Sequence, residues 1–385
     1  MSVTAARGFV AAGGHCGVKA DGQPDLALVA TADRGPVPAV GVFTRNEMTA
    51  APVQVSRTHL SDRQAAAVVL NSGNANAATG RAGLEHARSM AAATGEALGC
   101  PTDQVLVCST GLIGIPLPIE PIVTGVPGLA RELDVAGGSA AAEAIMTTDT
   151  VAKEVVVACG DATVGGMAKG AAMLAPNMAT MLAVLTTDAD AAPSTLQAAL
   201  DAGIAETFNA LIVDGAMSTN DTVFLLASGE AGPVSADDLT ASVTEACASL
   251  AHQMAADAEG ATKVVRIVVT GADSDHDALA AARNVAMSQL TKCSWYGERA
   301  YWGRVASDVG SSGAAFDQSR LSVSYGGVEV ASGGIAVAHD VEAVVEHMAG
   351  RDLEIAVDLH IGSGRAEVLT TDLTHAYIDE NMGDS

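Results

Sequence analysis

Short apolar runs bounded by turn residues alternate with longer helical stretches along the whole chain, and this pattern restricts the protein to a mixed α/β fold. Strands are expected at residues 26–31, 40–43, 66–70, 105–108, 155–158, 162–167, 181–186, 222–226, 264–270, 321–325, 328–331, 353–359 and 366–369. Helices are expected at residues 82–98, 195–208, 236–258 and 277–290. Ser194 and Ser235 are the expected N-caps of the second and third helices.

The order of these elements favours a layered α/β/β/α sandwich over a regular array of strand–helix–strand units. The chain has 385 residues, which is enough for two lobes or for one large body with an appended part. Hydrophobic residues make up 49% of the chain but aromatic residues only 3%, so the core must be built from Ala, Val, Leu, Ile and Met.

Two classes of partner are disfavoured by the formal net charge of −25, because nucleic acid and anionic membrane surfaces would both be repelled. No stretch reaches the roughly 20 uncharged apolar residues of a membrane span. Residues 1–9 lack the basic-then-apolar pattern of a signal peptide, which favours a cytoplasmic enzyme. The six cysteines form no C-x-x-C pair and no Cys/His cluster with zinc spacing, so neither a metal site nor a disulfide is expected.

One segment combines a glycine-rich strand, a turn and a threonine at the start of the next strand. It runs Gly165-Gly166-Met167-Ala168-Lys169-Gly170 and continues Ala171-Ala172-Met173-Leu174-Ala175-Pro176-Asn177-Met178-Ala179-Thr180-Met181-Leu182. Pro176 fixes its own φ and Asn177 tolerates turn conformations, so such a turn can hold the Ala179–Thr180 peptide bond in a strained geometry. Considered alone, a threonine before a strand is more often an ordinary turn residue.

The hydroxyl of Thr180 has the position that self-cleavage requires. It can attack the preceding carbonyl and move the acyl group from nitrogen to oxygen, and hydrolysis of that ester leaves Thr180 as a new N-terminus. The α-amine, with an ordinary pKa of about 8, can then serve as the base for the hydroxyl of the same residue. Nucleophile and base would both come from Thr180.

The segment that ends at residue 182 closely resembles the processing site of the ornithine acetyltransferase family, also called glutamate N-acetyltransferase. Other segments resemble this family in the right order: Val42-Phe43-Thr44-Arg45-Asn46, Asn71-Ser72-Gly73-Asn74-Ala75-Asn76, Cys108-Ser109-Thr110-Gly111-Leu112-Ile113-Gly114, Ala144-Ile145-Met146-Thr147-Thr148-Asp149-Thr150, Asp214-Gly215 with Ser218-Thr219-Asn220-Asp221-Thr222, Asp257-Ala258-Glu259-Gly260-Ala261-Thr262-Lys263 and Thr370-Thr371-Asp372-Leu373. Because these matches are long, ordered and spread over essentially the whole chain, the protein is identified as a member of this family.

The resemblance implies a fold and a cleavage. The implied fold is the α/β/β/α sandwich of self-cleaving ornithine acetyltransferases and aminopeptidases, with a smaller C-terminal lobe. Cleavage between Ala179 and Thr180 would divide the chain into an α fragment, residues 1–179, and a β fragment, residues 180–385. Two copies of each fragment are expected to form a heterotetramer.

The resemblance also implies the site. Thr180 is the nucleophile, and the Thr110 hydroxyl and the Gly111 N–H form the oxyanion hole. The residues that the family uses to bind substrate correspond to Thr147, Lys169, Thr180, Glu259, Asn381 and Ser385. Lys169 suits the α-carboxylate of the substrate, and Glu259 suits a substrate ammonium. Structural roles, as acceptors that hold loops, are expected for Asp149, Asp214 and Asp221.

The implied reaction is a ping-pong acyl transfer. N-acetylornithine acetylates Thr180, ornithine leaves, and glutamate takes the acetyl group to become N-acetylglutamate. No cofactor is expected. Acetyl-CoA is left open as a second acetyl donor, because no segment resembles a loop that binds the phosphates of coenzyme A.

Two segments depart from the family. Where the family has Gly-x-Asp-Pro-Asn-Trp-Gly-Arg, this chain has Gly297-Glu298-Arg299-Ala300-Tyr301-Trp302-Gly303-Arg304. The tail keeps Asn381 but is short and acidic after it, so Ser385 fits the family less well. Two other functions stay open: a self-cleaving aminopeptidase or amidase that uses water as acceptor, and an unprocessed, non-catalytic binding protein.

Overall fold

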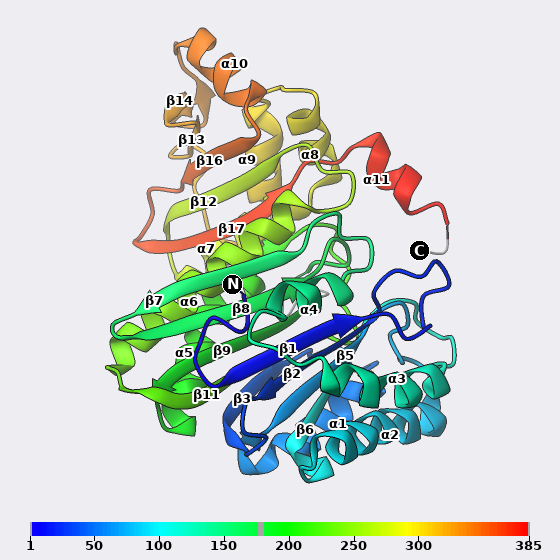
Figure 1. Ribbon diagram of the computed structural model, residues 1–385. Coiled ribbons are helices and arrows are strands. Elements are labelled where there is room, and N and C mark those ends of the chain that lie inside the picture. The colour runs from blue at the N-terminus through cyan, green and yellow to red at the C-terminus, as the bar shows by residue number, and fades with distance from the viewer. Residues whose placement is uncertain (1, 176–180, 384–385) are drawn as a thin grey trace. The chain divides into compact units, whose positions relative to one another are not determined.

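Two compact units make up the computed structural model, which describes residues 2–175 and 181–383 (Figure 1). The first unit comprises the described parts of residues 1–209 and 216–254, and the second comprises residues 210–215 and 255–383. The second unit is the smaller lobe that the resemblance implies. Cleavage before Thr180 would divide the first unit, so the compact units do not correspond to the fragments 1–179 and 180–385, which stay a prediction.

Two β-sheets form the middle of the first unit. The first sheet contains, in spatial order, β1 (Phe9–Gly14), β2 (Leu26–Thr31), β5 (Ala67–Asn71) and β6 (Val105–Ser109). The second sheet contains, in spatial order, β4 (Gln64–Ala65), β3 (Val37–Phe43), β11 (Thr222–Pro233), β9 (Leu182–Asp190), β8 (Ala162–Lys169) and β7 (Lys153–Cys159). The predicted hairpin of residues 155–158 and 162–167 is confirmed as the antiparallel pair β7 and β8.

The two sheets pack face to face, because alternate residues of each strand point to opposite faces. The core between them contains Val29 and Leu70 from the first sheet and Val184 and Phe224 from the second. The helices of this unit are α1 (Ala51–His59), α2 (Gly80–Leu98), α3 (Ile119–Arg131), α4 (Gly138–Ala144), α5 (Pro193–Glu206) and α6 (Ala236–Ala256). On its outer face the first sheet forms a second core with α1, α2 and α3.

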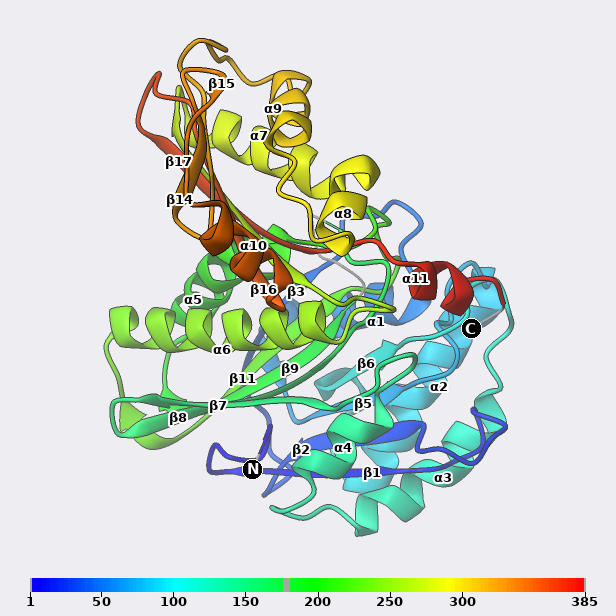
Figure 2. The ribbon, with the colours of Figure 1, turned by 90° about the horizontal axis from the view of Figure 1, so that it is seen from above.

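Helices α5 and α6 cover the outer face of the second sheet. The hydroxyl of Ser242 in α6 donates to the carbonyl of Ala158 in β7 at 3.0 Å, α5 contacts β3, and Figure 2 shows α6 running along this sheet. Helices, sheet, sheet and helices therefore follow one another within the first unit. The predicted α/β/β/α sandwich is confirmed.

Both predicted N-caps can be compared with the structure. Ser235 is confirmed, since its hydroxyl accepts the Asp238 N–H at 3.0 Å. The prediction that Ser194 is an N-cap is wrong, because α5 begins at Pro193 with Ala192 as its N-cap. Proline suits the first helical position, where its missing N–H would have no partner within the helix.

The second unit is one mixed sheet covered by helices. Its strands are, in spatial order, β10 (Leu211–Ile212), β17 (Gly364–Thr371), β12 (Val264–Ala272), β16 (Asp352–Asp358), β13 (Ser322–Tyr325), β14 (Val328–Ser332) and β15 (Ile335–Ala336). Its helices are α7 (Asp275–Met287), α8 (Gln289–Tyr296), α9 (Trp302–Gly310), α10 (Val341–Ala349) and α11 (His375–Glu380). The predicted single helix 277–290 is wrong, because Ser288 ends α7 and caps α8 through its hydroxyl, which accepts the Thr291 N–H.

Within residues 2–175 and 181–383, no helix combines the length and the apolar composition that crossing a membrane requires.

Candidate active site

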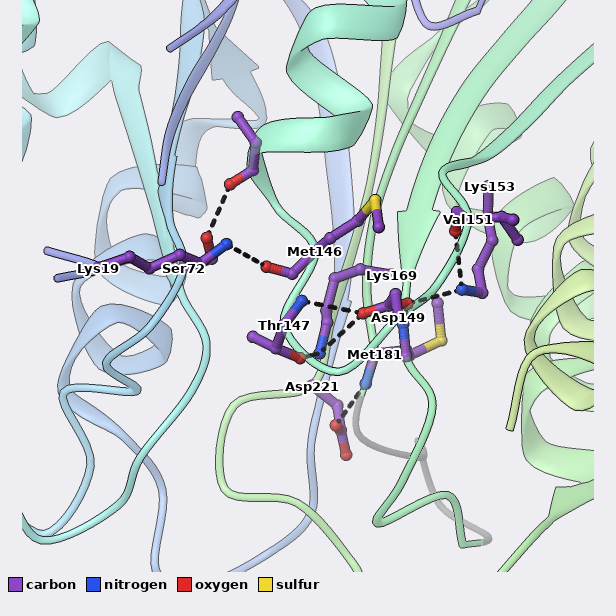
Figure 3. Close-up of polar contacts among 12 residues, drawn as sticks. Lys19, Ser72, Met146, Thr147, Asp149, Val151, Lys153, Lys169, Met181 and Asp221 are labelled. Carbon is purple, nitrogen blue, oxygen red and sulfur yellow. Dashed lines mark hydrogen bonds and ion pairs between the residues drawn. The ribbon is translucent and has the colours of Figure 1, made fainter. Parts of the chain in front are cut away.

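A buried carboxylate, Asp149, lies at the centre of a hydrogen-bond network in the first unit, beside the end of β8 (Figure 3). Its Oδ1 accepts hydrogen bonds from the Lys153 ammonium at 2.7 Å and from the Gly170 N–H at 2.8 Å. Its Oδ2 accepts the Thr147 N–H at 3.1 Å and lies 3.7 Å from the Lys169 ammonium. That ammonium donates to the Thr147 hydroxyl at 2.7 Å. The structure thus brings the predicted substrate residues Thr147 and Lys169 together.

The charges of this network are buried. Burial raises the pKa of Asp149, but the ammonium groups of Lys169 and Lys153, with hydrogen bonds from Lys153 and Gly170, outweigh it and hold the pKa well below its ordinary value. Lys153 is 0% exposed and Lys169 is 3% exposed. Asp149 is therefore ionised at neutral pH and holds two cations next to Thr147, which extends its predicted structural role.

The backbone directly after the predicted cleavage point is held by two hydrogen bonds. The N–H of Met181 donates to Oδ1 of Asp221 at 3.1 Å, and its carbonyl accepts the Thr222 N–H at 3.1 Å. The next residue, Leu182, pairs with Lys169 of β8 on one side and with Thr222 of β11 on the other. Asp221 therefore has the structural role predicted for it, and it places the start of β9 beside Lys169.

The predicted oxyanion residues follow directly on β6. Gly111 has a φ of +129°, and a Cβ atom there would lie 2.3 Å from the backbone carbon of Gly73, so only glycine fits. Thr110 is buried, and its N–H donates to the carbonyl of Asn71 at 3.0 Å. The segment 71–76 thus fixes the Thr110-Gly111 turn.

Asn220 joins this turn to the start of β9. Its Nδ2 donates to the carbonyl of Ser109, directly before Thr110, at 2.8 Å and to the carbonyl of Ala75 at 2.6 Å. The residue after Asn220 is Asp221, which holds Met181. Two consecutive residues therefore connect the turn with the backbone after the predicted cleavage point.

Further hydrogen bonds bring the remaining family-like segments of this unit together. The Thr44 hydroxyl donates to the carbonyl of Ser218 at 2.8 Å. The Ser72 hydroxyl donates to the carbonyl of Ala144 at 2.8 Å (Figure 3). Segments 42–46, 71–76, 108–114, 144–150 and 218–222 and the described part of 167–182 thus lie together.

A cavity of about 370 Å³ lies beside Thr147 and is lined in part by Lys19, Glu143, Met146 and Asp149. The Lys19 ammonium donates to the carbonyls of Pro24 at 2.9 Å and Met146 at 2.8 Å. A cavity of this size with convergent polar groups is a typical site for a small molecule.

Two residues of this site were not predicted from the sequence. Lys153 follows Asp149 by four residues, a spacing that favours an ion pair in a helix, although here the pair joins a loop to β7. Lys19 stands in a glycine-containing loop whose fold depends on Asp25, six residues later. The sequence does not single out either lysine, because the positions of both depend on the geometry of loops.

In the second unit, the predicted residues Glu259 and Asn381 are paired. The side-chain amide of Asn381 donates to Oε2 of Glu259 at 2.7 Å. Gly260 has a φ of +63°, and a Cβ atom there would lie 2.3 Å from the nitrogen of Tyr377. The Thr374 hydroxyl donates to the carbonyl of Gly260 at 2.7 Å. The turn after Glu259 therefore packs closely against the start of α11.

A cavity of about 100 Å³ in this unit is lined by Glu259 and by the buried Lys292. The Lys292 ammonium donates to the carbonyl of Val213 and to the Thr370 hydroxyl. Burial lowers the pKa of Lys292 to about 8, against the opposite effect of the nearby Asp214 carboxylate. Like Lys153, Lys292 is a buried cation that was not predicted from the sequence.

Asp372 joins the two family-like segments of the second unit. Its Oδ1 accepts the N–H groups of Thr262 at 2.9 Å and Lys263 at 3.0 Å. Segments 257–263 and 370–373 therefore lie together, as the segments of the first unit do.

The run that departs from the family links α8 to α9. Tyr301 is the N-cap residue of α9, and the guanidinium of Arg304 lies 4.7 Å from the centre of its ring. A cation over an aromatic face is attracted by it, so Tyr301 supplies a contact with the retained Arg304 in place of the proline-containing turn.

The predicted site residues thus form three groups: Thr147 with Lys169, Thr110 with Gly111, and Glu259 with Asn381. Ala179, Thr180 and Ser385 lie outside the described residues. The catalytic and binding roles of all these residues stay predictions.

Comparison with known proteins identifies the family. The ArgJ family model matches residues 10–383. Proteins named arginine biosynthesis bifunctional protein ArgJ include one from Mycolicibacterium paratuberculosis, 48% identical over 99% of this chain and 96% of that protein, and one from Thermobifida fusca, 47% identical over 99% of both chains. The crystal structure of the Mycobacterium tuberculosis ornithine acetyltransferase with ornithine is 45% identical, covers 46% of this chain and 94% of that chain, and gives a TM-score of 0.42. The chain belongs to the ArgJ family of arginine biosynthesis enzymes.

Proposed function

We propose that the protein cuts its own backbone before Thr180 and then moves the acetyl group from N-acetylornithine to glutamate through an acetyl ester on Thr180. Membership of the ArgJ family supports this reaction. The structural observation that carries it is the connection through Asn220 and Asp221, which ties the Thr110-Gly111 turn to Met181, one peptide bond from Thr180.

Self-cleavage begins when the Thr180 hydroxyl oxygen attacks the carbonyl carbon of Ala179. The carbon–nitrogen bond breaks, the nitrogen takes up a proton, and an ester links the two fragments. Water hydrolyses this ester, which leaves a carboxylate at residue 179 and a free α-amine on Thr180. The tetrahedral intermediates place negative charge on the carbonyl oxygen, and the Thr110 hydroxyl and Gly111 N–H are the proposed donors to it.

Transfer uses the same groups. The α-amine of Thr180 accepts the hydroxyl proton as the oxygen attacks the acetyl carbonyl of N-acetylornithine, and ornithine leaves with a proton on its amine. The amine of glutamate then attacks the acetyl ester, N-acetylglutamate leaves, and the threonine oxygen regains its proton. Acetate is neither formed nor consumed.

Each group of substrate residues has a proposed partner. Lys169, held by Thr147 and Asp149, would bind the α-carboxylate. Glu259, paired with Asn381, would bind the side-chain ammonium of ornithine, with Ser385 as a further contact from the tail. Acetyl-CoA stays open as a second donor, with no metal or other cofactor required by the chemistry. The family likeness supports two further proposals. The enzyme is cytoplasmic, and it is a heterotetramer with two copies of each fragment.

The experiment is to supply N-acetylornithine that carries a radiolabelled acetyl group, with and without glutamate. Without glutamate, ornithine release should stop at about one molecule per active site, because the acetyl ester has no acceptor. With glutamate, release should continue and the label should appear in N-acetylglutamate. Continued ornithine release without glutamate, with label in acetate, would identify a hydrolase and refute the transfer. Thr180→Ala is the inactive control.

A further inference from the structure

We infer that Lys19 binds the side-chain carboxylate of the acceptor amino acid, so that it determines the preference for a dicarboxylic acceptor. The inference rests on the proposed transfer to glutamate. Glutamate and ornithine must take turns on the same acyl-enzyme, yet their side chains carry opposite charges. A residue that recognises the second carboxylate of glutamate is therefore required in addition to one that binds the α-carboxylate of both.

The position of Lys19 is fixed by its own loop. The Asp25 carboxylate, which is fully buried, accepts the backbone N–H groups of Cys16 at 2.6 Å, Gly17 at 3.0 Å, Val18 at 2.7 Å and Lys19 at 2.9 Å. These four hydrogen bonds tie the backbone of residues 16–19 to one carboxylate, and they hold the pKa of Asp25 below its ordinary value although burial raises it. The backbone of Lys19 is thus anchored to Asp25.

The side chain of Lys19 connects the two parts of the candidate active site in the first unit. Its ammonium donates to the carbonyl of Met146, directly before Thr147 (Figure 3). Its stem lies against Gly73, where an added Cβ would come within 3.0 Å of Lys19 Cγ. The backbone of Gly73 in turn packs against Gly111. Lys19 therefore lies between the Thr147 segment and the proposed oxyanion turn.

The ammonium retains the capacity to bind a ligand. It has three N–H donors, and two of them have acceptors among the described residues, the carbonyls of Pro24 and Met146. Lys19 lines the cavity of about 370 Å³ together with Thr147 and Asp149. This volume exceeds that of a single amino-acid side chain, so a carboxylate can reach the ammonium from within it.

A second cation lies near Lys19, although the carboxylates of Glu143 and Asp149 line the same cavity. Burial lowers the pKa of Lys19, the carboxylates of Asp25, Asp21 and Asp149 raise it, and the positive charge of Lys169 lowers it further. Lys19 and Lys169 are therefore close enough to repel each other. A dicarboxylate can pair one carboxylate with each of the two cations, whereas glutamine has a single carboxylate for both.

The test compares two acceptors of nearly equal size, glutamate and glutamine, after acetylation of the processed enzyme by N-acetylornithine. Wild-type enzyme should prefer glutamate in kcat/KM. Lys19→Met, which keeps the length of the side chain but not its charge, should reduce the ratio of glutamate to glutamine by about tenfold or more, the loss expected for one charge-assisted hydrogen bond. Lys19→Arg, which retains the charge, should keep most of the preference.

The outcomes distinguish recognition of the acceptor by Lys19 from a merely structural role of Lys19 in its loop. A parallel loss for both acceptors, or an unchanged ratio, in Lys19→Met would overturn the inference. So would a wild-type enzyme that does not discriminate between the acceptors, a measurement that needs no variant to fold. A burst of ornithine release identifies preparations of each variant that are folded and processed. If wild-type enzyme fails to transfer acetyl from N-acetylornithine to any acceptor, the proposed function itself fails.

Discussion

The carboxylate of Asp221 accepts the backbone N–H of Met181 at 3.1 Å, so the residue after the predicted nucleophile is held by a fully buried acid. The N–H of Thr222 holds the Met181 carbonyl at the same distance, 3.1 Å. Together these bonds determine where β9 begins.

Two substitutions of Asp221 should distinguish the contribution of its hydrogen bond to stability from that of its charge. Asp221→Asn keeps an oxygen that can accept the Met181 N–H and removes a charge that burial disfavours, since burial raises the pKa of Asp221 well above its ordinary value. This variant should retain stability within about 1 kcal/mol. Asp221→Ala leaves the Met181 N–H without an acceptor, and it should lower the free energy of unfolding by about 1–3 kcal/mol and slow self-cleavage. Urea unfolding measures the stability of the two variants, and the rate at which the fragments appear measures cleavage. Equal destabilisation by the two substitutions would contradict this role.

Asp149 should contribute to stability at neutral pH and lose that contribution in acid. Its pKa is held below the ordinary 3.8, so the contribution is complete above that pH and decreases as the pH falls through the lower folded-state value. Asp149→Asn leaves Lys153 buried without its carboxylate and should be about 3–5 kcal/mol less stable at pH 7. The double variant with Lys153→Met should recover part of this loss. Thermal unfolding measured at a series of pH values tests the pH dependence and the effect of the substitutions. An unchanged melting temperature in Asp149→Asn at pH 7 would refute the stabilising role of Asp149.

Gly111 should tolerate no side chain, in contrast to Gly114, which also has a positive φ. A Cβ at Gly111 would lie 2.3 Å from backbone carbon, whereas one at Gly114, where φ is +83°, meets nothing within 4 Å. Gly111→Ala should therefore abolish cleavage and transfer, because the backbone that presents the proposed oxyanion donor must move. Gly114→Ala should cost about 1–2 kcal/mol, because an L-residue is strained at a positive φ, and it should stay active. Equal activity of the two variants in the acetyl-transfer assay would argue against the proposed position of the donor.

Lys292 should make stability rise with pH in the alkaline range. Burial lowers its pKa from 10.5 to about 8. Between these values the unfolded chain holds a proton that the folded chain has lost, so the free energy of unfolding increases with pH, by roughly 3 kcal/mol in total for this group. Subtracting the stability of Lys292→Met from that of wild type isolates this effect. The difference should grow from pH 8 to pH 10.5, and a difference that stays constant or shrinks would rule out a buried, easily deprotonated Lys292.

Most of the strands were predictable because apolar runs of Val, Leu and Ala carry a clear local signal, but β1, in which four of the six residues are alanine or glycine, was not predicted. Helix α3 was not, because it contains Pro127 as well as glycines that disfavour a helix. Its formation depends on burial of Ile122, Val126 and Leu129 against the first sheet. The break between α7 and α8 also depends on tertiary structure, since residues 277–290 read as one continuous helix.

The site could not be derived from local pattern, because the hydrogen bonds that build it join residues far apart in sequence. Asn220 binds the carbonyl of Ser109, 111 residues earlier, and Asn381 binds Glu259, 122 residues earlier. Among the signals in the sequence, only the family resemblance indicates these residues, and membership of the ArgJ family is confirmed. Lys19 carries no comparable signal, because its position depends on how Asp25 folds the loop.

Cleavage of the backbone before Thr180 is tested most directly by intact mass measurement on incubated, denatured protein. Wild-type protein should give two species whose masses correspond to residues 1–179 and 180–385, while Thr180→Ala should give one species of 385 residues. Wild-type protein that transfers acetyl groups while its chain stays uncut, or a Thr180→Ala variant cut at the same bond, would contradict self-cleavage by Thr180.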